Sequence, residues 1–223
     1  LPPMDYQPLA NAESIFEPIR ANDHLIHVPY HKYEPVIKFF EHAAKDPNVT
    51  HIKIIQYRVA PNSRIMEALI NAVKSGKQVY AFIEVKARFD EEANLRWGEQ
   101  LEKAGIVVRY SFPGLKVHSK LALVRRLEPD GPQLYSYLST GNFHEVTARI
   151  YSDQGLFTSD KRITSEVARI FSFLETVKLP SEEFKHLLVG QFNLRKTLIQ
   201  LIDFEIAEAG AGRTASIVLK INS

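Results

Sequence analysis

The sequence contains no cysteine, which excludes a disulfide framework, a thiolate zinc site and a cysteine nucleophile. It also lacks any apolar run near the ~20 residues that a membrane-spanning helix needs. The phosphate loop G-x-x-x-x-G-K-[ST] is absent, so a bound nucleotide would have to be held in another way. The 28 Lys and Arg residues nearly balance the 26 Asp and Glu, giving a net charge of +2. Bulk charge therefore gives no argument for nucleic acid or an anionic membrane, and any anion site must come from local clusters.

The 223 residues, 45% of them hydrophobic, suffice for a substantial buried core. From about residue 34 onward, apolar residues at helical spacing alternate with short β-branched runs. Helices are predicted over residues 34–45, 63–75 and 91–104, and strands over residues 52–55, 78–85 and 106–108. This alternation is typical of parallel βαβ units with right-handed crossovers, and it predicts an α/β fold.

The later part of the chain has a different pattern. Residues 116–125 and 133–139 predict neighbouring strands joined by a turn-rich segment, and residues 149–157 predict a further strand. Asp160 is suited to cap a helix that reaches about residue 176.

We expect three parts along the chain. Residues 1–30, with prolines at positions 2, 3, 8, 18 and 29, are predicted to be an extended lead-in from a preceding domain. Residues 31–179 are predicted to form the catalytic domain. Residues 180–223 are predicted to hold a helical connector and the start of a second, truncated domain, with a final strand over residues 216–221. On this reading the chain is a piece of a longer protein.

The sharpest chemical feature is His118, in the run Gly114-Leu115-Lys116-Val117-His118-Ser119-Lys120. Alternate side chains share one face of a strand, so Lys116, His118 and Lys120 are predicted to point the same way. A neutral imidazole can attack phosphorus, and the flanking ammonium groups offset charge on phosphate oxygens and lower the histidine pKa. For an isolated His-x-Lys pair, a solvated strand face is the more frequent explanation.

The next predicted strand ends in Leu138-Ser139-Thr140-Gly141-Asn142. A strand end that contains glycine can present backbone N–H groups to an anion, and the Asn142 amide adds a side-chain donor. By itself this segment also fits an ordinary turn.

Several arginines extend this picture. Arg58 and Arg88 each follow a predicted strand, and ligands gather at the carboxyl ends of parallel strands. Their planar guanidinium groups suit bidentate contacts to phosphate. Arg149 and Tyr151 would add to the same rim, with Arg149, Tyr151 and Asp153 on one strand face. Singly, each arginine is more often a surface ion pair, whereas together they predict a phosphate-binding rim.

Several runs in order resemble the first C-terminal domain of the large, histidine-phosphorylating polyphosphate kinases. They cover residues 28–31, 55–60, 86–94, 114–121, 139–143 and 147–153, and the resemblance extends from about residue 24 to the end. It implies a phospholipase D-like fold, in which a mixed sheet is flanked by helices and followed here by a mostly helical C-terminal segment. In that fold two domains pair, and each supplies one His-Lys half-site.

The resemblance implies that His118 becomes a phosphohistidine during reversible transfer of the ATP γ-phosphate to polyphosphate. Arg58 and Arg88 match positions of a magnesium–phosphate site, which a guanidinium can serve only indirectly, through a backbone oxygen, a water or the phosphate. Tyr151 matches a position that contacts the nucleotide. Where some members carry a second histidine, this chain has Tyr137, and a phenol cannot replace an imidazole as a phosphate carrier at neutral pH. The aspartate that follows His-x-Lys in phospholipase D enzymes is also missing, so a carboxylate that orients His118 must come from elsewhere.

We therefore expect the core of an ATP:polyphosphate phosphotransferase. The expected catalytic residues are His118 and Lys120, and the expected phosphate- or nucleotide-binding residues are Lys116, Asn142, Arg149 and Tyr151. The expected cofactor is Mg²⁺, with ATP or ADP as substrate. The expected partners are polyphosphate, the remaining domains of the parent chain and further copies in a homo-oligomer, without specific nucleic acid. We expect a cytoplasmic protein, and this expectation includes one that is attached peripherally to the inner face of the membrane.

Two other functions stay open at this point. A phospholipase D-like phosphodiesterase is one, because a fold does not fix a reaction, and it would turn over a diester without ATP. A non-catalytic polyphosphate-binding module is the other, because the chain supplies one half-site where this fold normally needs two.

Overall fold

The computed structural model describes residues 2–84, 91–112 and 114–219. Residues 1–178 form one compact unit and residues 179–223 form a second. The first unit contains the whole sheet and every described residue that we expected at the site, so it is considered first.

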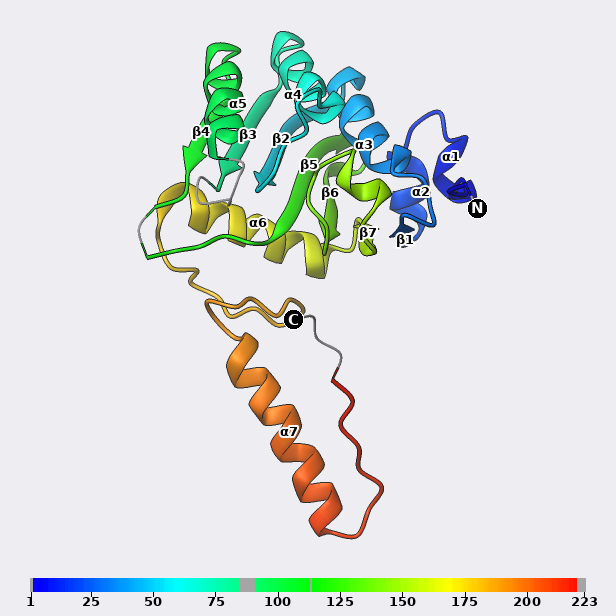
Figure 1. Ribbon diagram of the computed structural model, residues 1–223, viewed down its shortest axis with the longest axis vertical. Coiled ribbons are helices and arrows are strands. Elements are labelled where there is room, and N and C mark those ends of the chain that lie inside the picture. Colours follow the sequence, from blue (N-terminus) through cyan, green and yellow to red (C-terminus); the bar gives the residue numbers. More distant parts are fainter. Residues whose placement is uncertain (1, 85–90, 113, 220–223) are drawn as a thin grey trace. The chain divides into compact units, whose positions relative to one another are not determined.

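A seven-stranded mixed sheet organises the first unit, in the order β1-β7-β6-β5-β2-β3-β4 (Figure 1). The strands are β1 His24–Val28, β2 Val49–Gln56, β3 Gln78–Ile83, β4 Val107–Tyr110, β5 Lys120–Glu128, β6 Gly131–Ser139 and β7 Asp153–Thr158. Strands β2, β3 and β4 are parallel, whereas β5 runs antiparallel to β2 and the remaining neighbours are antiparallel as well. The predicted α/β class and the parallel βαβ units are confirmed.

The helices form where capping and apolar spacing place them. They are α1 Gln7–Ala10, α2 Phe16–Ala21, α3 Glu34–Lys45, α4 Arg64–Lys74, α5 Glu91–Lys103 and α6 Lys161–Thr176. The Ser63 side chain accepts a hydrogen bond from the Met66 N–H at the start of α4, at 3.3 Å. The predicted cap of α6 is confirmed, because the Asp160 carboxylate accepts from the Arg162 N–H at 2.8 Å.

Both faces of the sheet are covered. Helices α3, α4 and α5 lie over one face and α6 lies on the other (Figure 1). The first face packs into a core that includes the fully buried side chains of Phe39, Ile52 and Leu69. On the second face, the ring of Tyr80 contacts that of Phe171 from α6 with centroids 6.3 Å apart. Burial on both sides explains why β3 carries a nearly continuous apolar run.

The first 30 residues differ from the extended lead-in that we predicted. They contain α1, α2 and β1, and β1 pairs with β7 along the edge of the sheet. Pro8 stands in the first turn of α1, where a missing N–H costs no helical hydrogen bond. The prolines therefore start structure here instead of preventing it.

Two strand boundaries were also predicted wrongly. The strand expected over residues 116–125 begins only at Lys120, where pairing with Ser139 starts. The strand expected over residues 149–157 begins at Asp153, because Thr147–Arg149 form a short 3₁₀ helix in front of it. Within the described part of the chain, residues 116–119 and 149–152 have no strand beside them to pair with. The periodicity of a sequence does not show whether such a partner is present.

The second unit holds one long helix, α7 Leu194–Gly210, and none of its side chains is buried. Residues 216–219, the described part of the strand expected over residues 216–221, have no regular structure. Within the described residues, no helix is both long enough and apolar enough to cross a membrane.

Candidate active site

The candidate site is centred on His118, in the segment that joins β4 to β5. His118 is exposed, and Lys120 at the first position of β5 is only 3% exposed. The Lys120 Nζ lies 3.0 Å from His118 Nδ1. The two side chains therefore meet as predicted, although only Lys120 belongs to a strand.

Strand direction explains why other residues reach this place. Strand β2 ends at Gln56 and is followed by Tyr57 and Arg58. Because β5 is antiparallel to β2, the start of β5 lies at the edge where β2 ends. The ring of Tyr57 lies 4.8 Å from that of His118, and Lys120 Nζ lies 5.0 Å from the centre of the Tyr57 ring. Tyr57 thus forms one wall of the His-Lys pair.

A buried glutamine joins this wall to the loop that carries Asn142. The Gln56 amide nitrogen donates to the backbone oxygens of Arg58 and of Phe143. Gln56 is fully buried, so these contacts fix the end of β2 against the β6–β7 loop. The side-chain oxygen of Asn142 is buried and has no hydrogen-bond partner among the described residues. Asn142 therefore retains a polar side-chain atom that the described residues leave unsatisfied.

The β6–β7 loop is tightly built around Asp153. The Thr140 hydroxyl donates to Asp153 Oδ1 at 2.8 Å. A Cβ atom on residue 141 would lie 2.5 Å from Asp153 Oδ2, so only glycine fits there. Burial lowers the pKa of Lys120, and the negative charge of the Asp153 carboxylate opposes this shift.

The electrostatics favour a neutral imidazole. Burial and the positive charges of Lys120, Lys116 and Arg58 lower the pKa of His118, so it stays unprotonated near neutral pH. Burial, together with Arg58, lowers the pKa of Lys120 to about 8, against the opposing effect of Asp153. The structure thus brings Lys116, Arg58 and Lys120 close enough to act on His118. This cluster can bind an anion and offer it a nucleophilic nitrogen.

Other predicted site residues lie elsewhere or outside the described residues. Arg149 ends the 3₁₀ helix and Tyr151 follows it, and both are exposed. Within the described part of the chain, neither has a recorded contact with His118. The prediction that Arg149, Tyr151 and Asp153 share one strand face is wrong, because β7 begins only at Asp153. Arg88 lies outside the described residues.

Tyr137, at the position where some family members carry a second histidine, does not face the site. It is 2% exposed, and its ring packs against those of Phe143 and Phe157. Burial raises the pKa of its phenol. Tyr137 is therefore a core residue.

The sequence analysis missed two residues near His118. Tyr57 stood only within a matching run, and nothing in its local pattern indicates an aromatic wall. Glu84 follows β3 and is fully buried, and its carboxylate accepts the Val117 N–H at 2.9 Å. The one available signal was that Glu84 is a charged residue at the end of an apolar strand.

The residues around His118 fit an anion better than a metal ion. Among the described residues, no group of three or more His, Asp and Glu is placed to hold a metal. The side chains nearest to His118 are cations, namely Lys116, Lys120 and Arg58. A divalent cation would therefore have to be held mainly by its ligand's oxygens.

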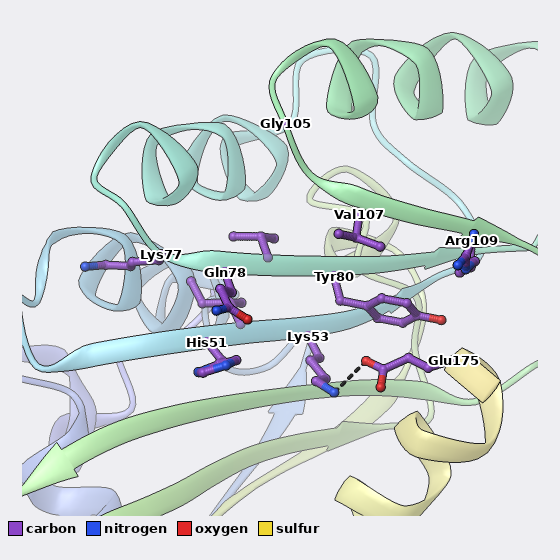
Figure 2. A pocket seen from close by; sticks show the side chains of 11 residues that line it. His51, Lys53, Lys77, Gln78, Tyr80, Gly105, Val107, Arg109 and Glu175 are labelled. Carbon is purple, nitrogen blue, oxygen red and sulfur yellow. Dashed lines mark hydrogen bonds and ion pairs between the residues drawn. The ribbon is translucent and has the colours of Figure 1, made fainter.

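A cavity of about 560 Å³ lies on the same sheet but away from His118. Figure 2 shows it over strands β2, β3 and β4, bordered by Glu175 at the end of α6. Its lining includes His51, Lys53, Tyr80 and Arg109 but no residue predicted for the site. The cavity lies toward the amino ends of these strands, whereas His118 lies near the carboxyl end of β2.

Comparison with solved structures defines the class of protein. Nuc from Salmonella typhimurium, a phospholipase D family member, matches with a TM-score of 0.54 over 69% of this chain and 93% of that chain. Because the two sequences are only 16% identical, this match shows the fold alone, which is phospholipase D-like. The family model described as "Polyphosphate kinase C-terminal domain 1" matches residues 14–180. The chain therefore belongs to the polyphosphate kinase family.

The relatives agree with this assignment. A polyphosphate kinase of Vibrio vulnificus (strain YJ016) is 46% identical over 226 residues, covering 100% of this chain and 32% of that protein. One from Yersinia pestis is 49% identical over 208 residues, covering 93% and 30%. The crystal structure of polyphosphate kinase from Porphyromonas gingivalis matches with a TM-score of 0.83 and 46% identity, covering 94% of this chain and 35% of that chain. The chain thus spans about a third of the length of these relatives.

Proposed function

We propose that this chain forms the phosphohistidine-bearing part of an ATP:polyphosphate phosphotransferase, with His118 as the phosphate carrier. The observation that carries the proposal is the 3.0 Å contact between His118 and Lys120 within a cationic cluster, in a chain of this family. A solvated strand face would not hold Lys120 at 3% exposure beside a buried tyrosine ring.

The reaction proceeds in two reversible steps. In the first, His118 Nε2 attacks the γ-phosphorus of ATP, because Nδ1 is occupied by Lys120. The Nε2–P bond forms while the bond from the γ-phosphorus to its bridging oxygen breaks, and ADP leaves with the electron pair. In the second, the terminal oxygen of polyphosphate attacks the same phosphorus and releases the imidazole.

The proton on His118 must sit on Nδ1 for Nε2 to attack. The Lys120 amine faces Nδ1, and its pKa of about 8 gives it a substantial neutral fraction near that pH, which can accept the Nδ1–H hydrogen bond. In its charged form the same amine offsets charge on the transferring phosphoryl group. Lys120 therefore has two roles, one for each protonation state.

The remaining assignments follow from charge and position. Lys116 and Arg58 bind phosphate oxygens beside His118, and Asn142 binds from the β6–β7 loop. Arg149 and Tyr151 stay predicted nucleotide contacts, and Arg58 with Arg88 stays a predicted magnesium–phosphate site. Mg²⁺ would arrive on the phosphates of ATP, in keeping with the cationic surroundings of His118.

The functional unit is expected to be larger than this chain. Because the chain supplies one His-Lys half-site and its relatives are about three times as long, the second half-site would come from further domains. We call this chain together with those domains the complete kinase. A cytoplasmic homo-oligomer remains the expected setting, and we predict poor or no turnover by the 223 residues alone.

The test is phosphoenzyme formation by the complete kinase. With γ-labelled ATP, the wild type should take up one label that is labile in acid and stable in base. Addition of polyphosphate or ADP should then remove the label from the protein. His118→Asn should take up no label. Equal labelling of that variant would refute the assignment of His118. Turnover of a phosphodiester without ATP would instead support the diesterase, and polyphosphate binding without labelling would support the binding module.

A further inference from the structure

Glu84 is a fully buried carboxylate immediately after β3, at the edge of the sheet where the site lies. Its backbone N–H donates to the Gln56 carbonyl at 2.9 Å, which continues the pairing of β3 with β2 by one residue. A carboxylate buried this deeply needs hydrogen-bond donors, because an uncompensated buried charge is strongly destabilising.

The donors come from the segment that precedes His118. Glu84 accepts the Ser111 hydroxyl at 2.7 Å and the Val117 backbone N–H at 2.9 Å. Ser111 directly follows β4, and Val117 directly precedes His118. The side chain of Glu84 thus binds both ends of the connection that leads to the phosphate carrier.

Little else fixes this connection. In the described part of segment 111–119, two backbone N–H groups bond to backbone carbonyls: Ser111 to Ile83 at 2.9 Å and Leu115 to Phe112 at 3.3 Å. Strand pairing resumes only at Lys120. The backbone next to His118 is thus tied to the sheet at two points, the Val117 N–H that bonds to Glu84 and the His118 carbonyl that accepts from Lys120 Nζ.

The same glutamate also reaches the aromatic wall. Its backbone carbonyl accepts the Asn94 amide at 3.1 Å, and that amide donates to the Tyr57 carbonyl at 2.8 Å. Asn94 is itself fully buried in α5. Glu84 is therefore connected to the His118 segment through its side chain and to Tyr57 through its backbone carbonyl and Asn94.

We propose that Glu84 is a positioning residue that holds the His118 segment in register with Lys120 and Tyr57 for phosphoryl transfer. The catalytic part of this statement rests on the proposed function, whereas the holding of the segment does not. Glu84 acts through the position of the backbone. Its described side-chain contacts go to Ser111 and Val117, so it differs from a carboxylate that orients a catalytic histidine directly.

If Glu84 acts by accepting hydrogen bonds, a substitution that keeps an acceptor should be tolerated and one that removes it should not. If its negative charge were required, both kinds of substitution would be harmful. In Glu84→Gln the amide oxygen can accept the Val117 N–H, and the Ser111 hydroxyl can turn to accept the amide N–H. Glu84→Leu has a similar volume but leaves the Val117 N–H without an acceptor. Ser111→Ala removes one contact and keeps the Val117 contact, so it is the matched control.

The experiment measures single-turnover labelling by γ-labelled ATP in the complete kinase, with ATP affinity and hydrogen exchange of segment 111–119 by mass spectrometry. Glu84→Leu should lower the labelling rate about 10- to 100-fold, as expected for a reacting group displaced by up to about 1 Å. It should leave ATP affinity nearly unchanged and speed exchange in the segment. Glu84→Gln and Ser111→Ala should stay close to wild type in all three measurements.

Wild-type labelling and exchange in Glu84→Leu would overturn the proposal, and so would a Glu84→Gln variant as slow as Glu84→Leu. Should the leucine variant fail to fold, Glu84→Asp replaces it, because its side chain is one methylene too short to span both donors. Unchanged labelling and exchange in that variant would be equally decisive against the proposal. If the wild type takes up no label, the proposed function fails by itself, and the exchange comparison still decides whether Glu84 holds the segment.

Discussion

The chain contains two His-x-Lys segments, His51-Ile52-Lys53 and His118-Ser119-Lys120. They differ in their position relative to the strands and in the partners of their lysines. The first lies wholly within β2, and both of its polar side chains line the cavity of Figure 2. The second spans the start of β5, so that its histidine lies outside the sheet. In the structure, the strand predicted over residues 116–125 contains only Lys120 of this second segment, whereas residues 51–53 all lie in β2.

The partners of the two lysines separate the segments further. Lys53 forms an ion pair with Glu175 at 2.5 Å, which neutralises its charge. Lys120 instead packs over the ring of Tyr57. Its pKa is affected by the positive charge of Arg58 and, in the opposite direction, by the negative charge of Asp153. The pKa values of His51 and His118 are both lowered, by burial first and by neighbouring cations second. A lowered histidine pKa is therefore common to both segments and does not identify the site. The feature that sets His118 apart is that it lies outside a strand and beside three cations, Lys116, Lys120 and Arg58.

The largest contrast should come from the two lysines. Lys120→Ala should lower the labelling rate of the complete kinase about 100-fold, because it removes a charge aimed at the transferring phosphoryl group. Lys53→Ala should leave the labelling rate unchanged and cost at most about 1 kcal/mol of stability, since its ion pair is partly exposed. Single-turnover labelling and thermal unfolding measure both quantities, and equal labelling of the two variants would remove the contrast.

Tyr57 gives the next effect. Tyr57→Leu should slow labelling about 2- to 10-fold, because an aromatic contact of this kind contributes about 0.5–1.5 kcal/mol. Tyr57→Phe keeps the ring at 4.8 Å from His118 and should label at close to the wild-type rate. A phenylalanine variant as slow as the leucine variant would show that the hydroxyl, and not the ring, matters.

Lys116 gives a smaller effect, visible in the pH profile. Its charge lowers the pKa of His118, so Lys116→Ala should raise that pKa. Protonated histidine cannot attack phosphorus, and the acidic limb of the labelling rate should therefore move to higher pH in the variant. The profile of Lys53→Ala should match that of the wild type. A limb that stays in place, or moves to lower pH, would contradict the assignment.

The smallest effect is expected at His51. His51→Asn should change neither the labelling rate nor its pH profile, because its ring nitrogen contacts Thr50 within β2, at 2.9 Å. Any loss of labelling beyond the experimental error would show that the two His-x-Lys segments cooperate.

Much of the fold could be predicted from the sequence because it depends on local signals. The apolar spacing of residues 34–45 and 63–75 and the cap at Asp160 gave α3, α4 and α6 with close boundaries. The pairing of β1 with β7 joins His24 to Phe157 across more than half the chain, and no local pattern encodes it. Hence the first 30 residues were predicted as a lead-in when they complete the sheet.

The site was predictable as far as residue types go. His118, Lys120 and Arg58 were identified from charge and from the strand that precedes Arg58, and the structure brings them together. Their support was not predictable, because the Val117 N–H bonds to a side chain, that of Glu84, instead of to a neighbouring strand. Side-chain-to-backbone contacts between distant segments leave no periodic pattern in the sequence.

Gly155 and Tyr137 occupy one shared space. A Cβ atom on residue 155 would lie 2.2 Å from the Tyr137 hydroxyl, so the phenol can be present only while residue 155 has no side chain. A lineage that replaced Tyr137 with the smaller histidine would open a void at the centre of the β6–β7 pair, and a side chain on residue 155 could then fill it. The order of substitutions is therefore constrained: Tyr137 must be replaced by a smaller residue before Gly155 can be replaced by a larger one. Across the family, the two positions are expected to covary.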